Sequence, residues 1–225
     1  MKKVLLFNFL LFALTIHAQY DSRFGVTAGA NEYYMKGDFL FSRSNTGFTI
    51  GLVGTIPISE NSEILTEITV SRHRMEFIGR ENELASPEWI KFHLDRSNVS
   101  FIYDYDILHF LDDDLAIGFC AGPSFAFFGN FIPTDKSKEG YLLDPYGMDT
   151  EYMRLDGYGE TMAFNVLAAF GPSVRYVNLE GSLRYYKGIT DTYRNFPGSS
   201  PYTQFTGKDS YLSFTLTYYF GHSLD

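Results

Sequence analysis

The feature that most constrains the fold of this chain is an alternation of bulky apolar residues with small or polar ones. It is clearest near the end, where Leu212, Phe214, Leu216, Tyr218 and Phe220 are separated by serine, threonine or tyrosine. The same pattern recurs in segments 48–56, 115–127 and 162–170. A period of two residues is typical of a β-strand, and these segments lack the 3.6-residue stripe of a helix. The sequence therefore predicts an all-β fold.

The composition of the two strand faces distinguishes a barrel from a sandwich. In a soluble sandwich the bulky residues point inward and the charged ones outward. Here the minor face is rich in Gly, Ala, Ser and Thr, which suits the narrow interior of a small barrel. The chain also has 22 Phe, 17 Tyr and 20 Gly, as expected for strands with an aromatic outer face. We therefore predict that the bulky face meets lipid, with these lipid-facing residues: Phe119, Phe125, Phe164, Phe170, Leu212, Phe214 and Leu216.

The spacing of the alternating segments predicts an eight-stranded antiparallel up-and-down transmembrane β-barrel. Short connections (58–62, 108–113 and 177–178) alternate with long ones (35–45, 75–90, 128–160 and 190–208), as in outer-membrane barrels with tight periplasmic turns and long outer loops. This places both termini in the periplasm and the protein in the cell outer membrane. Loop 128–160, which is rich in Asp and Glu, is expected to be extracellular and less ordered than the barrel. The predicted strands are 24–34, 46–57, 63–74, 91–107, 114–127, 161–176, 179–190 and 209–220.

The first residues have the pattern of an export signal. Lys2 and Lys3 precede an apolar run over residues 4–16, and Ala18 provides a small residue at the expected cleavage point. The run is shorter than the roughly 20 residues that a membrane-spanning helix needs. We therefore expect residues 1–18 to be a signal peptide and residues 19–225 to form the barrel domain. The lone Cys120 excludes an internal disulfide.

Three segments carry short motifs of a known family. Segment 115–123 reads Leu-Ala-Ile-Gly-Phe-Cys-Ala-Gly-Pro, segment 177–190 reads Val-Asn-Leu-Glu-Gly-Ser-Leu-Arg-Tyr-Tyr-Lys-Gly-Ile-Thr, and segment 212–220 is an aromatic closing strand. Together with the Ala18-Gln19 junction, they resemble the PorT-like outer-membrane β-barrel family of Bacteroidota. One departure is that residues 221–225 follow Phe220, where many such barrels end. The resemblance implies an outer-membrane barrel whose C-terminal strand is recognised by the assembly machinery. An accessory role in type IX secretion is a property of particular members of this family.

The histidines offer one arrangement that catalysis could use. Barrels of this size that modify lipid A need a nucleophile, a base and an orienting group at a lipid-facing rim. His73 and His93 fall near the outer ends of neighbouring predicted strands, where a site shared with Ser71 or Ser97 is conceivable. Polar residues at a wet rim are the simpler and favoured explanation, and the His-x-Ser element of the lipid A deacylases is absent. We expect no catalytic residue, with a lipid-modifying enzyme kept as an alternative.

The charged residues limit the partners. With a net charge of −9, the chain lacks the basic face that nucleic-acid binding requires. The acidic run 112–114 lacks the glycine and distal glutamate of a calcium loop, so we expect no metal and no cofactor. Interleaved acids and tyrosines in loop 128–160 suit contact with a protein or a glycan. They equally suit carboxylates that bridge lipopolysaccharide phosphates through divalent cations.

Five charged residues fall on the minor face and are predicted to form a charge network in the lumen. Buried ions must be paired, because removal from water costs several kcal/mol per ion. We therefore expect Arg175 and Arg184 to lie within salt-bridge reach of at least one of the three carboxylates. Because the interior of eight strands holds little more than side chains, the network is predicted to plug the lumen. A small pore remains an alternative to a non-enzymatic barrel with a structural or interaction role. The five residues are Glu67, Asp104, Arg175, Glu180 and Arg184.

Overall fold

The computed structural model describes residues 22–37, 41–111, 114–127, 129–144, 153–154, 164–190 and 207–220. The predicted signal peptide and Asp112 and Asp113 lie outside these ranges. Eight long strands account for most of the described chain, and each runs antiparallel to its neighbours. They are β1 (Phe24–Gly37), β2 (Ser42–Ser59), β3 (Ser62–Arg80), β4 (Glu88–Phe110), β5 (Leu115–Phe127), β9 (Phe164–Tyr176), β10 (Leu179–Gly188) and β11 (Gly207–Phe220).

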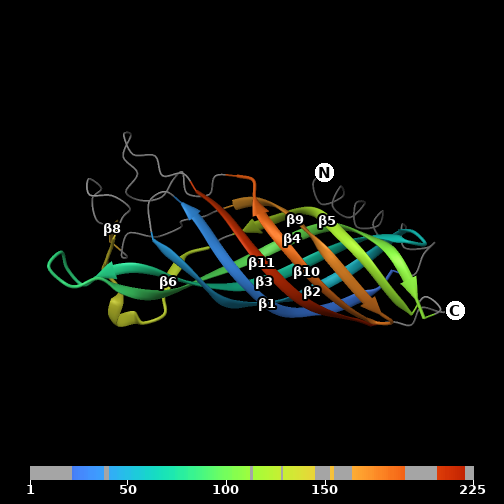
Figure 1. The fold of residues 1–225 in the computed structure, drawn as a ribbon, viewed down its shortest axis with the longest axis horizontal. Coiled ribbons are helices and arrows are strands. Elements are labelled where there is room, and N and C mark those ends of the chain that lie inside the picture. Colours follow the sequence, from blue (N-terminus) through green and yellow to red (C-terminus); the bar gives the residue numbers. More distant parts are fainter. Residues whose placement is uncertain are drawn as a thin grey trace, which may run out of the picture.

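The eight strands close on themselves in sequence order (Figure 1). The first and last strands pair along their whole length, from Phe24 opposite Phe220 to Gly37 opposite Gly207. Strand β3 pairs with both β2 and β4, so each long strand has two partners and the sheet has no free long edge. This confirms the predicted eight-stranded antiparallel up-and-down barrel.

Three short strands and one helical turn complete the described chain. They are β6 (Phe131–Pro133), η2 (Lys136–Lys138), β7 (Leu142–Leu143) and β8 (Met153–Arg154). Strand β6 pairs with β4, β7 pairs with β3, and β8 pairs with β7. In the part of the chain that the structure describes, no helix is long and apolar enough to cross a membrane.

The two ends of the barrel differ in their connections. At one end, called here the turn end, residues 60–61, 111–114 and 177–178 link successive strands. Residues 38–41, 81–87, 128–163 and 189–206 link the strands at the other end, called the loop end. The predicted turns are therefore confirmed, but two of the predicted loops are too long. Segment 35–45 shrinks to 38–41 and segment 75–90 shrinks to 81–87, because β1 to β4 all extend further toward the loop end than predicted.

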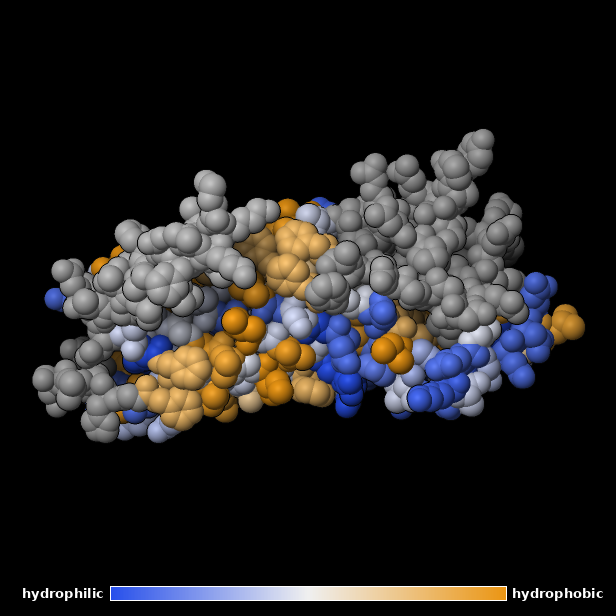
Figure 2. All heavy atoms as spheres, turned by 180° about the vertical axis from the view of Figure 1, so that it is seen from behind, coloured by the Kyte–Doolittle hydropathy of each residue, from blue (hydrophilic) through white to orange (hydrophobic). Residues whose placement is uncertain are grey.

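The outward face is apolar over most of the barrel. Six of the seven predicted lipid-facing side chains are exposed there, from Phe119 on β5 to Leu216 on β11. The seventh, Phe125, also points outward but is half-buried, because its ring packs 6.5 Å from Phe101 and 6.2 Å from Phe164. Seen from behind, hydrophobic residues gather over the barrel, while hydrophilic ones prevail toward the loop end (Figure 2).

The inward side chains are small at the points where neighbouring strands approach closely. A Cβ on Gly171 would lie 1.9 Å from the carbonyl oxygen of Leu183, and one on Gly29 would lie 2.0 Å from that of Phe214. Real Cβ atoms do not approach backbone so closely, so only glycine fits at these positions. The glycines of the minor face thus permit the tight curvature of an eight-stranded barrel.

Candidate functional site

The lumen holds the five charged residues predicted to lie there. Glu67, Asp104, Glu180 and Arg184 are buried, and Arg175 is largely so. Nη1 of Arg184 lies 2.6 Å from Oε1 of Glu67, and its Nη2 lies 3.6 Å from Oε1 of Glu180. The structure therefore pairs Arg184 with two of the three predicted carboxylates.

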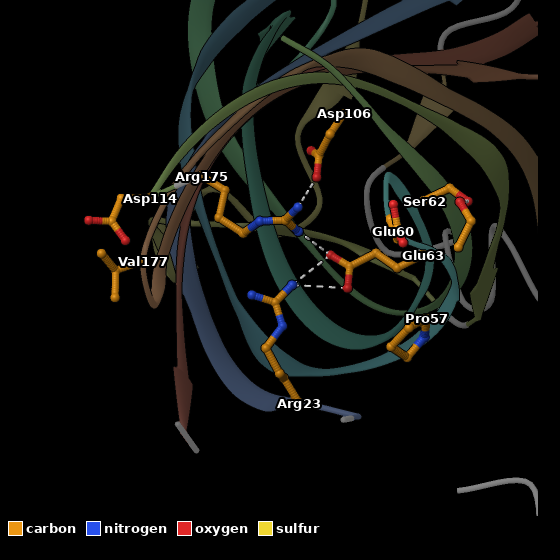
Figure 3. Close-up of a pocket in the computed structure, with 10 residues that line it drawn as sticks. Arg23, Pro57, Glu60, Ser62, Glu63, Asp106, Asp114, Arg175 and Val177 are labelled. Atoms are coloured by element: carbon orange, nitrogen blue, oxygen red, sulfur yellow. Dashed lines mark hydrogen bonds and ion pairs between the residues drawn. The ribbon is translucent and has the colours of Figure 1, made fainter. Parts of the chain in front are cut away.

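The predicted partners of Arg175 are wrong. Its guanidinium donates to Glu63, 2.5 Å away, and to Asp106. Glu63 is also held by Arg23, whose Nη2 lies 2.8 Å from Oε1, so this carboxylate bridges two arginines (Figure 3). Arg175 lies near the turn end, and the acids at that level are Glu63 and Asp106 rather than Glu67. Both share the inward parity of the predicted acids, so the alternation itself contained the signal that identifies them.

A cavity of about 290 Å³ opens at the turn end beside this group. Its apolar lining includes Pro57 and Val177 (Figure 3). Its charged lining consists of the linked group Arg23, Glu63, Asp106 and Arg175, together with Glu60 and Asp114. Because the four linked groups already bind one another, the cavity is the open end of the lumen network. Each of these four charged groups is therefore already paired and is not available to bind a small polar ligand.

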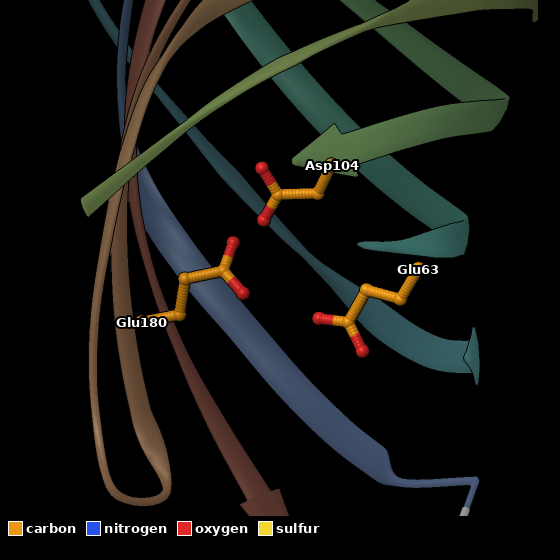
Figure 4. Close-up of side chains that lie close together, drawn as sticks. All are labelled: Glu63, Asp104 and Glu180. Carbon is orange, nitrogen blue, oxygen red and sulfur yellow. The ribbon is translucent and has the colours of Figure 1, made fainter. Parts of the chain in front are cut away.

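Three carboxylates converge deeper in the same half of the lumen (Figure 4). One oxygen from each of Glu63, Asp104 and Glu180 lies within 4.8 Å of the others, and all three residues are buried. Oxygen donors at this spacing suit a hard divalent cation. However, the Ser173 hydroxyl donates to Asp104 at 2.8 Å and the Tyr219 hydroxyl to Glu180 at 2.7 Å, while Glu63 binds two arginines. Since protein donors already serve each carboxylate, the trio is explained without a metal.

The half of the lumen nearer the loop end is filled by aromatic rings around a second ion pair. Asp209 accepts from Arg96, from the Tyr33 hydroxyl at 2.5 Å and from Nδ2 of Asn165 at 3.1 Å. The rings of Tyr186 and Tyr211 stack 4.2 Å apart. Sequence analysis missed Arg96 and Asp209, although both have inward parity. Ion pairs and aromatic rings therefore occupy both halves of the described lumen.

The two histidines of the conceivable catalytic site do not meet. His73 is buried in the lumen, where its Nδ1 lies 2.8 Å from Oδ1 of Asn31. His93 pairs with Arg74 and lies on the outward face of β4. The inward Ser71 is hydrogen-bonded to Thr49 at 2.9 Å. The two histidines therefore do not share a site. His73 pairs with Leu94 and His93 with Arg74, so the histidines point to opposite faces of the sheet.

At the loop end, the β3–β4 hairpin runs past the last pairing of β2, at Phe77, and past the last pairing of β5, at Ser97 (Figure 1). The polarity of its two faces inverts along it. Up to Val70 the outward side chains of β3 are mostly apolar, whereas the next two outward residues toward the loop end are Arg72 and Arg74. On the inward face, the side chains change from polar, as at His73, to apolar from Met75 on. This segment, residues 75–94, is called here the projection. Its inner face is buried and apolar, and its core residues are Met75, Phe77, Ile90, Phe92 and Leu94.

Part of the long connection 128–163 covers this inner face. Phe131 of β6 packs edge-on against Phe77, with ring centroids 5.5 Å apart, and Leu143 of β7 is buried beside β3. Arg80 donates two hydrogen bonds to Asp144, 2.8 and 2.5 Å long. Residues 129–144 of the predicted loop 128–160 are therefore folded against the projection. Apolar side chains inside the projection need cover, and this stretch of the connection provides it.

These features define the fold as an eight-stranded up-and-down β-barrel with a filled lumen and a folded projection at one end. No family model matches the sequence, and no curated protein matches it significantly. Among solved structures, it is similar to Ail, the attachment invasion locus protein of Yersinia pestis, with a TM-score of 0.42, 10% identity, and coverage of 89% of this chain and 99% of that chain.

Two further solved structures are similar to the same extent. The outer membrane protein OprG from Pseudomonas aeruginosa has a TM-score of 0.40 and 10% identity, covering 90% of this chain and 95% of that chain. Neisserial surface protein A has a TM-score of 0.39 and 15% identity, covering 89% and 99%. These similarities concern the shape of the fold alone.

Proposed function

We propose that this protein is a bacterial outer-membrane β-barrel with its loop end outside the cell. The outward apolar face supports this, because water would oppose an exposed belt of Phe, Tyr, Leu and Ile of this extent. A barrel also satisfies its backbone groups between strands, as a membrane interior requires. The short turns at the other end match periplasmic turns, which would place both termini in the periplasm.

We further propose that the protein works by binding, through the projection, and is not an enzyme. The observation that carries this proposal is that the projection has its own hydrophobic core, so it holds a fixed shape above the barrel. At its tip, Leu84 is 98% exposed. Leu84 therefore marks the part of the hairpin that a partner above the barrel would meet first.

The filled lumen supports binding over conduction. Buried ion pairs lie nearer the turn end, and the Tyr186–Tyr211 stack with Arg96 and Asp209 lies nearer the loop end. A water-filled channel would instead leave charges hydrated and unpaired. We therefore expect no steady single-channel conductance from the purified protein in planar bilayers.

Site-specific crosslinking in intact cells tests the interaction role. A photo-crosslinking amino acid at Leu84 should give adducts of defined mass, and one at Val177, in a turn at the opposite end, should not. Membrane fractionation of both variants checks the location. Equal adducts at both positions, or none at Leu84 in protein that reaches the outer membrane, would refute binding through the projection.

The resemblance to PorT-like barrels suggests one version of this function, an accessory role in type IX secretion. In that case the Leu84 adduct would contain a component of the secretion machinery, identifiable by mass spectrometry. A partner unrelated to secretion would retain the interaction role and reject this version of it.

A further inference from the structure

A sharp change of polarity crosses the outward face of β3 and β4. On these strands the apolar face ends at the row of Val70 and Ser97, whereas on β2 it continues one residue pair further, to Phe48 opposite Arg72. The next row on β3 and β4 is Arg72 and Asp95, followed by Arg74 and His93 and then by Glu76 and Lys91. Under the proposed orientation, this change marks the level of the lipid headgroups in the outer leaflet.

The side chains just beyond this boundary carry surplus positive charge in an otherwise acidic protein. Four cations and two carboxylates lie there, and this group is called here the basic face. Its members are Arg43, Arg72, Arg74, Glu76, Lys91 and Asp95. The excess is local, because the whole chain has a net charge of −9.

Two of the four cations are already paired. Arg72 donates two hydrogen bonds of 2.7 Å to Asp95. Arg43 lies 3.8 Å from Glu76, and its guanidinium sits 4.4 Å above the ring of Trp89. Arg74 and Lys91 are exposed and make no ion pair with the described residues. The surplus charge therefore resides on these two side chains.

The setting of Arg74 and Lys91 selects the kind of anion they would bind. They project on the same outward face one row apart, within reach of a single headgroup. Guanidinium and ammonium groups are good phosphate ligands. Below them, beyond the Arg72–Asp95 pair, lies the apolar row with Ile50 and Val70, where acyl chains would run. A phosphate attached to acyl chains would contact both the two cations and the apolar row, whereas free phosphate would contact the cations alone.

We propose that the basic face binds a phosphate group of lipid A through Arg74 and Lys91. The proposal rests on the outer-membrane location proposed above. Arg72 and Arg43 flank the phosphate but stay with their carboxylates. The site thereby fixes one lipopolysaccharide molecule against the β3–β4 wall, at the base of the projection.

Lipid binding by the full mature chain, refolded in a maltoside detergent, tests this. The chain has one tryptophan, and Trp89 lies on the basic face under Arg43, so its fluorescence reports on the site. Three probes are titrated: bisphosphorylated lipid A, lipid A with both phosphates removed, and inorganic phosphate. The bisphosphorylated lipid should bind tightest, and R74Q/K91Q should weaken it at least about tenfold, since each charge-assisted contact is worth that much.

A matched control removes the same charge elsewhere. K187Q/K208Q replaces two exposed lysines on the outward faces of β10 and β11, strands that border neither β3 nor β4, and should bind like the wild type. Equal binding by R74Q/K91Q and this control would overturn the proposal. So would tight binding of dephosphorylated lipid A, or competition by millimolar inorganic phosphate.

The test separates this proposal from the proposed location. If the wild-type protein fractionates away from the outer membrane, the location fails whatever the detergent titration gives. If it fractionates there and circular dichroism shows R74Q/K91Q folded, then unchanged lipid A affinity rejects the phosphate site alone.

Discussion

Replacing Arg184 by leucine should destabilise the barrel by stranding a carboxylate in the lumen. Arg184 and Glu67 have side chains only 3% and 6% exposed, and their charged atoms are 2.6 Å apart. Removing one partner of a buried ion pair typically costs about 3–5 kcal/mol, since the other charge is left without water or a counter-ion. Glu180 would also lose Arg184 but would keep the Tyr219 hydroxyl at 2.7 Å.

The double variant R184L/E67M distinguishes this explanation from simple loss of packing. It replaces the pair by apolar side chains of similar volume, a change that is often neutral in buried sites. R184L/E67M should therefore be more stable than R184L, with a coupling energy of at least about 1 kcal/mol.

Urea unfolding of refolded protein measures both values. Circular dichroism of the sheet and the shift in gel mobility between folded and unfolded barrel would serve as independent probes. Losses that add within about 0.5 kcal/mol would refute the reasoning, because they would mean that Arg184 and Glu67 contribute separately.

Other residues give predictions of the same kind. Leu216→Arg should cost about 2–4 kcal/mol in lipid vesicles if the residue lies near the bilayer midplane, whereas a loss below about 0.5 kcal/mol would contradict its lipid-facing position. Phe77→Ala, which removes a ring packed 5.1 Å from Phe92, should speed proteolysis at residues 81–87 on intact cells while the barrel keeps its gel mobility. Cys120 is fully buried, so maleimide should label it only after unfolding; labelling of the folded protein would place it outside the packed lumen. Protease added to intact cells should spare turn 111–114, and cleavage there would reverse the proposed orientation.

The alternation of residues was sufficient to predict the barrel because it is a local property. Within an unbroken stretch of strand, such as Leu212 to Phe220, the outward positions follow from the two-residue period alone. It failed at the projection, where β3 runs to Arg80 and β4 begins at Glu88. From Met75 on, the strand is apolar inward and mostly polar outward, as in a water-soluble sheet. A search for bulky residues on the outer face therefore ended the strands too early.

The partners in the lumen could not be read from the sequence for a different reason. Arg175 and Glu63 lie on β9 and β3, and Arg96 and Asp209 lie on β4 and β11. These pairs cross the barrel, and their levels depend on how far each strand is staggered against the next. Parity tells which side chains point inward. It does not tell which of them meet.

The seam between β1 and β11 has a consequence for how the barrel is made. It joins residues as far apart in the chain as Phe24 and Phe220. Before it forms, both strands expose a row of unpaired N–H and C=O groups, which a membrane interior strongly disfavours. Gly29 leaves the approach of β11 free of any side chain, since a Cβ there would strike the Phe214 carbonyl. A ribosome must therefore finish nearly the whole chain before this protein can close, and until then some other surface has to shelter its two open edges.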